Sequence, residues 1–316
     1  MSGPDPAVAA VRTAVRRFLS EVAGKHLACG EIAVAVSGGA DSLALAAATA
    51  HVAQRLDLRV HGLVVDHGLQ AGSAEVAQRA AAQCRELGLS AEVVPVTVTG
   101  DGGPEAAARR ARYAALRPAD GLVLLGHTRD DQAETVLLGL GRGSGPRSIA
   151  GMRPLDPPWG RPFLSVPRVT TAAACAALGL TPWSDPHNAD PAFTRVRLRT
   201  EVLPLLEDVL QGGVTAALAR TAAQLRDDND ALDALAEAFE GDPADVTAVE
   251  VLPAALRRRV IRRWLLASGT PELSDSHVRS VDALVAEWRG QGGVWLPGGL
   301  VARRAHGRLN LDPRQS

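Results

Sequence analysis

The first half of the chain alternates between short apolar runs and longer mixed runs, and this alternation limits the fold more than any other feature. Four short runs, rich in Val, Ile and Leu, have the length of strands: residues 32–36, 60–65, 91–96 and 121–125. Four longer runs follow them with helical spacing: residues 41–55, 73–87, 104–116 and 131–140. This order predicts an α/β fold with a doubly wound parallel sheet, which binds its ligands at the carboxyl ends of the strands.

The sequence changes character after residue 140. Residues 141–191 contain many Gly, Pro and Arg and predict an irregular connection, and a new helix is expected from residue 194. The tail predicts two helices and a terminal hairpin. At 316 residues the chain is long enough for two cores. We therefore expect a first domain at 1–205, a helical linker at 206–240 and a smaller helical or α+β domain at 241–316.

The formal net charge is −1, which argues against a simple nucleic-acid coat protein. The charges are nevertheless distributed unevenly. Residues 139–200 carry eight Arg against three Asp, residues 201–250 carry two Arg against twelve acids, and residues 255–304 carry nine Arg against four acids. The two basic blocks are suited to face a polyanion, with the acidic block as a solvated helix surface.

Cysteine usage and hydropathy indicate the compartment. Cys29, Cys84 and Cys175 are far apart and form no CxxC pair, which predicts single buried thiols and argues against a structural zinc site. No run of about 18 apolar residues occurs, and the N-terminus lacks the charged-then-apolar order of a signal peptide. We expect a cytoplasmic protein with no membrane partner.

A polar turn joins the first strand-like run to the first helix-like run. It consists of Ser37, Gly38, Gly39, Ala40, Asp41 and Ser42. The glycines let the backbone approach a ligand, the serines add hydroxyl donors, and the start of the helix adds N–H groups and a positive dipole end. These features predict a phosphate or pyrophosphate nest, in which Asp41 would repel the anion unless it holds Mg²⁺. The alternative is that Ser and Asp only cap the helix.

Walker A and GxGxxG patterns are absent, and the turn instead resembles the pyrophosphate loop of the N-type ATP pyrophosphatases. This superfamily has a Rossmann-like sheet, of the adenine nucleotide alpha-hydrolase type, and cleaves ATP between its α- and β-phosphates to adenylate an acceptor oxygen. The resemblance implies ATP and Mg²⁺ as cofactors. Polar turns at the ends of two further strands add Asp66, His67 and Gly126 to the expected nucleotide site.

Four further stretches, at residues 65–77, 104–116, 126–152 and 183–206, resemble the tRNA(Ile)-lysidine synthetases, as does the tail. That family is a group of ligases that use ATP and free L-lysine. They convert the wobble cytidine of the CAU-anticodon isoleucine tRNA into lysidine, through an adenylated tRNA, with release of AMP and pyrophosphate. The resemblance implies a catalytic ATP pyrophosphatase domain followed by a small tRNA-binding domain, in the shorter of the family's two forms. Val196 departs from the family pattern, which has Asn there.

The chemistry requires a group that holds the lysine ammonium and accepts its proton, because the free side chain is almost fully charged at pH 7. Asp131 and Glu134 are three residues apart at a predicted helix start and share a face. His127 precedes them and is expected to line the same pocket, and Asp131 is the second expected metal ligand beside Asp41. The alternative is that the acids only stabilise the helix dipole, with Asp130 as an N-cap.

Aromatic residues make up only 3% of the chain, which leaves arginine contacts to phosphates as the expected mode of tRNA recognition. The resemblance implies that Arg112 acts in catalysis or binds phosphate. The alternative for this helix is a simple Glu105–Arg109 ion pair on its surface. Along one predicted helix Arg195 and Arg199 share a face, whereas Arg197 does not. The expected tRNA-binding residues are Arg109, Arg195, Arg197, Arg199, Arg257, Arg258 and Arg262.

Two other functions fit part of the sequence. A tRNA thiolase of the same superfamily would share the turn, but thiolases that use protein sulfur carriers need paired cysteines. A regulatory nucleotide-binding protein that has lost catalysis would also keep the turn, although Asp41, Asp131 and Glu134 argue against it. The sequence leaves a homodimer open.

Overall fold

The computed structural model describes residues 3–26, 30–68, 70, 72–99, 104–117, 121–143 and 145–313, without the side chains of 23–26 and 104–106. Cys29 and the side chain of Glu105 therefore lie outside the described residues. The chain forms two compact units. Unit 1 comprises Met1–Leu137 and Gly151–Arg220, and unit 2 comprises Leu138–Ala150 and Thr221–Ser316.

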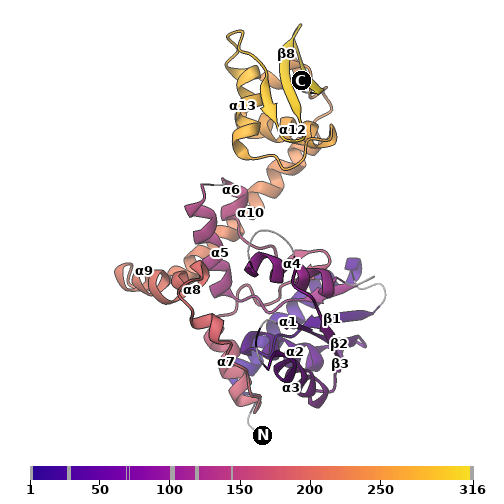
Figure 1. The fold of residues 1–316 in the computed structure, drawn as a ribbon, viewed down its shortest axis with the longest axis vertical. Coiled ribbons are helices and arrows are strands. Elements are labelled where there is room, and N and C mark those ends of the chain that lie inside the picture. The colour runs from indigo at the N-terminus through magenta and orange to yellow at the C-terminus, as the bar shows by residue number, and fades with distance from the viewer. Residues whose placement is uncertain are drawn as a thin grey trace. The chain divides into compact units, whose positions relative to one another are not determined.

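Unit 1 is built on a six-stranded sheet with the order β3-β2-β1-β4-β6-β5. Strands β1, β2 and β3 lie side by side in Figure 1. All neighbouring strands are parallel except β5 and β6, so the predicted doubly wound parallel sheet is confirmed. The strand order reverses between β1 and β4, which is where sheets of this kind bind ligands. The strands are β1 Glu31–Ala35, β2 Arg59–Asp66, β3 Ser90–Pro95, β4 Leu122–Leu124, β5 Leu155–Asp156 and β6 Trp159–Gly160.

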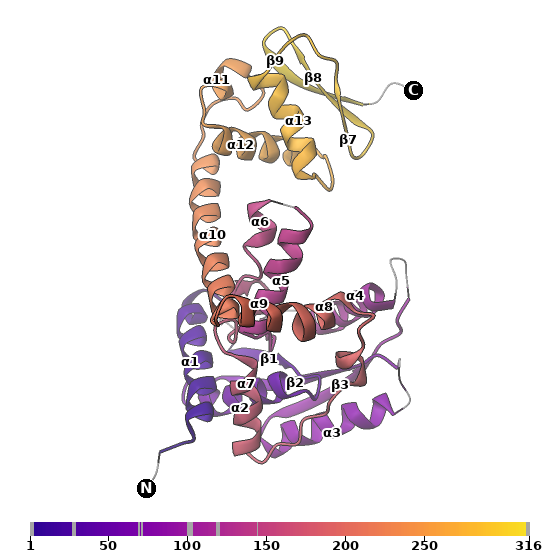
Figure 2. The ribbon, with the colours of Figure 1, turned by 90° about the vertical axis from the view of Figure 1, so that its left-hand side faces the viewer.

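Helices cover both faces of this sheet. On one face α1, α2 and α7 pack on one another around a core that includes Leu19, Ile32 and Leu45 (Figure 2). On the other face a smaller cluster surrounds Leu116 and Trp159. The helices are α1 Pro6–His26, α2 Ala40–Ala53, α3 Ser73–Glu86, α4 Pro104–Leu116, α5 Arg129–Gly141 and α7 Arg168–Ala177. The four helices and four strands predicted for the first half are confirmed to within a few residues.

The prediction of an irregular connection over residues 141–191 is wrong in part, because β5, β6 and α7 lie within it. Gly160 explains how such a segment can join the sheet. A Cβ at this position would lie 2.7 Å from Phe18 Cζ and 2.8 Å from Leu124 Cδ2, so only glycine allows the backbone this close to the core.

A helical stretch follows, and its elements are η1 Pro186–Ala189, α8 Thr194–Arg197, η2 Leu198–Val202, α9 Leu203–Val209 and α10 Val214–Glu237. Among the described residues no single helix is long and apolar enough to cross a membrane. The helical segments Thr194–Val209 and Val214–Glu237 have the length and composition of a membrane span only when taken together. The chain bends by 96° between them.

Unit 2 contains the predicted pair of helices and the terminal hairpin, with a further strand, β7, and the short helices α6 and α11, which the sequence did not indicate. The β8–β9 turn has positive φ at both His306 and Gly307, as tight hairpin turns with a right-handed twist require. Val260, Ile261 and Leu284 are among the side chains of its core. The elements are α6 Pro146–Ile149, α11 Val246–Glu250, α12 Ala254–Ala267, α13 Asp275–Ala286, β7 Val294–Leu296, β8 Leu300–Ala305 and β9 Arg308–Pro313.

Candidate active site

The polar turn at residues 37–42 connects β1 to α2 at the point where the strand order reverses. Gly38 has φ +83°, a conformation that L side chains rarely adopt. Gly39 is the N-cap of α2 and makes no side-chain cap, so the first N–H groups of α2 have no capping side chain as acceptor. An anion can take these N–H groups at the positive end of the helix dipole. The geometry supports the predicted phosphate nest.

Ser42 and Gly126 contribute to the turn through its shape. The Ser42 hydroxyl accepts a hydrogen bond from the Ser37 N–H at 3.1 Å and donates one to the Gly39 carbonyl at 2.9 Å. The hydroxyl expected to face the ligand is thus used to close the turn. At the end of β4, a Cβ on Gly126 would lie 3.0 Å from the Asp41 carbonyl oxygen. Gly126 therefore allows the end of β4 to approach the first turn of α2.

Asp41, in the first turn of α2, is joined to Asp131 of α5 by one guanidinium. Arg168 Nε lies 3.3 Å from Asp41 Oδ2, and Arg168 Nη2 lies 2.5 Å from Asp131 Oδ1. The other Asp41 oxygen accepts a hydrogen bond from the Thr171 hydroxyl. Burial raises the pKa of Asp41 above its ordinary value, although Thr171 and Arg168 oppose the shift. The site thus holds two carboxylates close enough to need a cation between them.

Asp131 has two functions in the structure. Its Oδ2 accepts hydrogen bonds from the Thr128 N–H and the Thr128 hydroxyl, both at 2.8 Å, which caps the start of α5. Its Oδ1 faces Arg168. Burial alone would raise the pKa of Asp131, but Arg168 and the Thr128 hydrogen bonds outweigh it and hold this pKa below its usual value. One oxygen therefore caps the helix, and the other is directed at Arg168 and leaves the site interpretation as a prediction.

Glu134 is fully buried and surrounded by arginines. Arg199 donates to both carboxylate oxygens, from Nε at 2.8 Å and from Nη2 at 3.2 Å. Arg195 and Arg168 have nitrogen atoms 3.7 Å and 3.5 Å from the same carboxylate. The shared face of Asp131 and Glu134 is confirmed by Arg168, which contacts both. A lysine ammonium would therefore have to share or replace guanidinium partners here.

The alternating arginines at 195, 197 and 199 separate as their spacing predicts. Arg195 and Arg199 point to Glu134, whereas Arg197 forms an exposed ion pair with Glu201 at 2.8 Å. Arg195 and Arg199 thus belong to the carboxylate cluster, which leaves Arg197 as the member of the three that faces solvent.

His127 lies beside this cluster at the end of β4. Burial lowers its pKa to about 4, Asp131 opposes this shift, and Arg161, Arg109 and Arg195 add to it. Its Nδ1 is buried and has no hydrogen-bond partner among the described residues. At neutral pH His127 is therefore an uncharged ring with an unpaired nitrogen.

Asp66, His67, Arg109 and Arg112 form a separate group at the end of β2 and on α4. Arg112 Nε lies 3.2 Å from His67 Nε2, and Asp66 accepts a hydrogen bond from the Gly68 N–H at 3.0 Å. Arg109 stacks on the Tyr113 ring at 4.7 Å. Among the described residues, no hydrogen bond or ion pair joins Arg112 to Asp131 or Glu134. The expected catalytic Arg112 is held by His67 instead.

Three arginines expected to bind tRNA lie on α12 in unit 2. The Arg257 side chain is 10% exposed, its Nε lies 2.5 Å from Asp282, and it donates to the Leu252 carbonyl at 3.0 Å. Its guanidinium is used inside the unit, which argues against the predicted tRNA contact. Arg258 shares Asp282 at 2.7 Å, and Arg262 donates to the Leu273 carbonyl at 2.9 Å. Both are half-buried.

The carboxylates of the site can be compared with the ligands that Mg²⁺ usually takes. Among the described residues, no group of three His, Cys, Asp or Glu side chains could hold a metal ion. Asp41 and Asp131 offer carboxylate oxygens on either side of Arg168. Mg²⁺ usually binds through one or two carboxylates, and substrate phosphates complete its shell. The residues therefore fit Mg²⁺ together with a phosphate held in the adjacent turn.

Sequence reasoning missed Arg168 and Thr171 of α7 as site residues. Arg168 is the first residue of α7, where the positive end of the helix dipole disfavours a cation. An arginine at a helix start indicates a nearby carboxylate, and this was the available signal. The Thr171 hydroxyl gave no comparable signal.

Comparison with known proteins places this geometry in a family. Residues 11–206 match the family model described as a PP-loop domain, and residues 245–309 match the TilS substrate binding domain. The curated "tRNA(Ile)-lysidine synthase" of Rhodococcus jostii is 58% identical over 98% of both chains. The enzymes of that name from Nocardia farcinica and Mycobacterium tuberculosis are 59% and 56% identical, over 95% and 94% of this chain and 97% and 93% of theirs.

A solved structure shows the same fold at much lower identity. The "U34-tRNA thiolase NcsA from Methanococcus maripaludis" aligns with a TM-score of 0.58 and 18% identity, over 69% of this chain and 79% of that one. At this identity the likeness concerns the fold alone. The full-length relatives and the two domain matches decide between the superfamily members: the chain belongs to the tRNA(Ile)-lysidine synthase family.

Proposed function

We propose that this protein ligates L-lysine to carbon 2 of the wobble cytidine in the CAU-anticodon isoleucine tRNA, using ATP and releasing AMP and pyrophosphate. The observation that carries the proposal is the position of Asp41, Asp131 and Glu134 around Arg168, directly beside a turn with exposed helix N–H groups. One site thus offers both an anion nest and buried carboxylates, as an ATP-dependent ligation of an amine requires.

In the first step, the turn at 37–42 would bind the phosphates of ATP while the cytidine oxygen is adenylated. Asp41 and Asp131 would hold Mg²⁺, which neutralises phosphate charge when bound. Arg168 already lies between these two carboxylates. If Mg²⁺ were bound by these two carboxylates, the Arg168 guanidinium would be free to pair with the phosphates. We therefore assign Arg168 a phosphate-binding function during the reaction.

In the second step, the lysine amine would displace AMP. Free lysine carries a carboxylate as well as its ammonium groups. Arg195 or Arg199 can release Glu134 and pair with the lysine carboxylate instead. Glu134 and Asp131 then become available to the side-chain ammonium. His127 is uncharged at neutral pH because its pKa is about 4, so its unpaired Nδ1 can accept a hydrogen bond from the lysine ammonium.

The tRNA would bind through arginines outside the carboxylate cluster. Arg197, Arg109 and Arg112 in unit 1 and Arg258 and Arg262 in unit 2 are our candidates. We keep 1–205 as the catalytic domain, 206–240 as a linker and 241–316 as a tRNA-binding domain, and we place the enzyme in the cytoplasm. A homodimer is a further prediction, which light scattering of the pure protein tests.

Mass analysis of the wobble nucleoside tests the function. The protein is incubated with ATP, Mg²⁺, L-lysine and an isoleucine tRNA transcript, and the tRNA is then digested to nucleosides. We expect lysidine only when lysine is present, with one AMP released per product. Unchanged cytidine together with tight ATP binding would indicate a nucleotide-binding protein without catalysis, and sulfur at carbon 2 would indicate a thiolase.

A further inference from the structure

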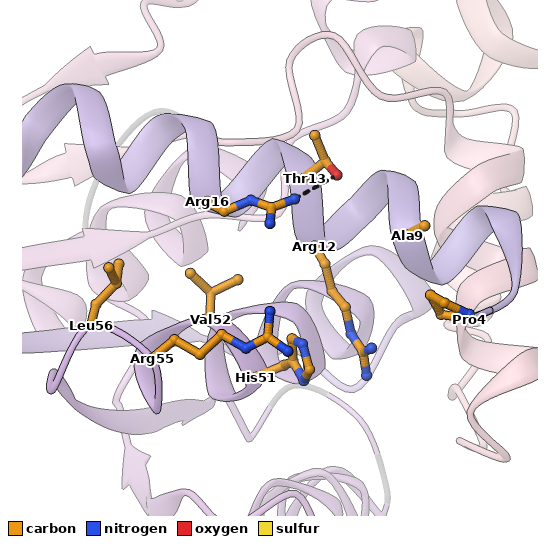
Figure 3. Close-up of a pocket in the computed structure, with 9 residues that line it drawn as sticks. All are labelled: Pro4, Ala9, Arg12, Thr13, Arg16, His51, Val52, Arg55 and Leu56. Atoms are coloured by element: carbon orange, nitrogen blue, oxygen red, sulfur yellow. Dashed lines mark hydrogen bonds between the residues drawn. The ribbon is translucent and has the colours of Figure 1, made fainter. Parts of the chain in front are cut away.

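A second polar feature of unit 1 lies far from the turn at 37–42. A groove of about 320 Å³ runs between α1 and the last turn of α2 (Figure 3). Helix α2 has 14 residues, so its two ends lie about 20 Å apart. The turn at 37–42 precedes the first residue of this helix and the groove lies at its other end. The groove is therefore separate from the nucleotide site.

The groove is lined by four basic side chains and no acidic one. Arg12 and Arg16 come from α1, His51 comes from α2, and Arg55 comes from the turn that follows α2. Figure 3 shows the guanidinium groups of Arg12 and Arg55 gathered near the His51 ring. Arg16 donates to the Thr13 hydroxyl at 3.2 Å. Among the described residues neither Arg12 nor Arg55 forms an ion pair.

This clustering is electrostatically unfavourable in the free protein. Partial burial, and then Arg12, Arg55 and Arg16, lower the pKa of His51. An isolated surface arginine needs no ligand, and it commonly finds a carboxylate on its own helix. Arg17, the neighbour of Arg16 on α1, does so with Glu21 at 2.9 Å. The groove residues instead lie beside one another without a carboxylate among the lining residues, so an anion bound here would relieve their mutual repulsion.

The shape and residue type specify the anion further. Guanidinium groups bind phosphate through paired N–H donors, and Arg12 and Arg55 lie together beside the His51 ring, with Arg16 on the same groove (Figure 3). Val52 and Leu56 form an apolar part of the wall beside these cations. An apolar wall limits solvent screening and can contact a ribose or another carbon skeleton attached to the phosphate.

We propose that this groove is a second phosphate-binding site, distinct from the nucleotide turn. Its ligand is a phosphate group, carried either by the tRNA backbone or by a free phosphorylated molecule. The tRNA source rests on the proposed function, whereas the free-ligand source does not. The groove would add a contact to tRNA at the far end of α2 from the turn at 37–42 in the first case and a regulatory anion site in the second.

The test uses the full-length double variant Arg16→Gln/Arg55→Gln, in which two exposed arginines lose their charge and half-buried Arg12 stays. Arg17→Gln is the matched control, because it removes an arginine from the same helix outside the groove. Two measurements are made with a non-hydrolysable ATP analogue saturating the turn. They are tRNA affinity as a function of salt, and titration with inorganic phosphate followed by calorimetry.

If the source is tRNA, the double variant binds tRNA more weakly and its log–log salt slope falls by about one to two units. If the source is a free ligand, the wild type binds inorganic phosphate with the turn blocked, the double variant loses that binding, and the tRNA slope is unchanged. Arg17→Gln should match the wild type in both measurements. The proposal is overturned if the double variant matches Arg17→Gln throughout.

Lysidine formation by the wild type is measured in the same preparations. A wild type that makes no lysidine but loses phosphate binding in the double variant would contradict the proposed function and support the groove. A wild type that makes lysidine, with a double variant equal to the control, would support the function and contradict the groove.

Discussion

The protein contains two buried clusters of arginine and carboxylate, one in each unit. The active-site cluster consists of Asp41, Asp131 and Glu134 with Arg168, Arg195 and Arg199. The α12–α13 cluster consists of Asp282 with Arg257 and Arg258. Their central carboxylates are equally hidden, since the side chain of Glu134 is 0% exposed and that of Asp282 is 4% exposed. Burial alone therefore does not distinguish a functional ion pair from a structural one.

The difference lies in how completely the groups are paired. Each oxygen of Asp282 faces one arginine at 2.5 or 2.7 Å, and Arg257 donates its remaining hydrogen bonds to backbone carbonyls. In the active-site cluster several nitrogen–oxygen distances are 3.3–3.7 Å. Exposure of the arginines does not separate the clusters, because Arg168, Arg199 and Arg258 are 25%, 31% and 34% exposed. Incomplete pairing leaves groups free to exchange partners with a ligand.

The largest expected effect is on the stability of unit 2. Asp282→Ala removes the buried carboxylate that pairs with buried Arg257 and half-buried Arg258, and should cost about 3–5 kcal/mol of unfolding free energy. Urea unfolding followed by circular dichroism measures it. Asp275→Ala is the matched control on α13, because its pair with Arg279 is about half exposed on both sides. Equal destabilisation by the two variants would mean that the α12–α13 cluster is not a structural lock.

The next largest effect is on catalysis. Asp41→Asn should lower pyrophosphate release at least about a hundredfold, or about 2.7 kcal/mol in the barrier, because it removes a charge that we expect to hold Mg²⁺ during adenylation. Affinity for tRNA should change little. Single-turnover pyrophosphate release at saturating Mg²⁺ measures the effect. A near-normal rate would show that Asp41 does not hold the metal. The ion pairs of the active-site cluster would then be structural, like those of the α12–α13 cluster.

The sequence was sufficient for features that depend on neighbours along the chain. Alternating runs predicted the parallel sheet, and helical spacing correctly separated Arg197 from Arg195 and Arg199. Glycine content misled for residues 141–191, because Gly160 belongs to a strand through tertiary contacts with Phe18 and Leu124.

Pairing across long separations could not be predicted in this way. Arg168 meets Asp41 across 127 positions, and Arg257 meets Asp282 across two helices. A basic block in a sequence gives the charge of each residue and not its partner. Charge reversal at Arg257, which from the sequence would report on tRNA binding, is now expected to disrupt the interior of unit 2.

A smaller effect concerns the affinity for lysine. Glu134→Gln should raise the lysine concentration required about tenfold, while a burst of pyrophosphate persists, because adenylation does not require the amine. Higher pH should partly rescue the variant, since the lysine side chain has a pKa near 10.4 and its free-amine fraction rises with pH. Separate single-turnover measurements of pyrophosphate and modified tRNA, across pH, test this. An unchanged lysine dependence would reduce Glu134 to a structural partner of Arg199.

The smallest effect separates the arginines of one helical stretch. Arg197 is exposed and pairs with exposed Glu201, whereas Arg199 holds buried Glu134. Arg197→Gln should leave lysine dependence and unfolding unchanged, and should lower the log–log salt slope of tRNA binding by about one unit if Arg197 contacts a phosphate. Arg199→Gln, two residues away, should instead alter lysine dependence, because Glu134 loses its two-point partner and becomes a buried carboxylate with weaker compensation. The two variants are compared in parallel by lysine titration and by tRNA binding at several salt concentrations. Equal changes in lysine dependence for both variants would contradict this prediction. Exposure and pairing would then fail to distinguish functional from structural arginines in this protein.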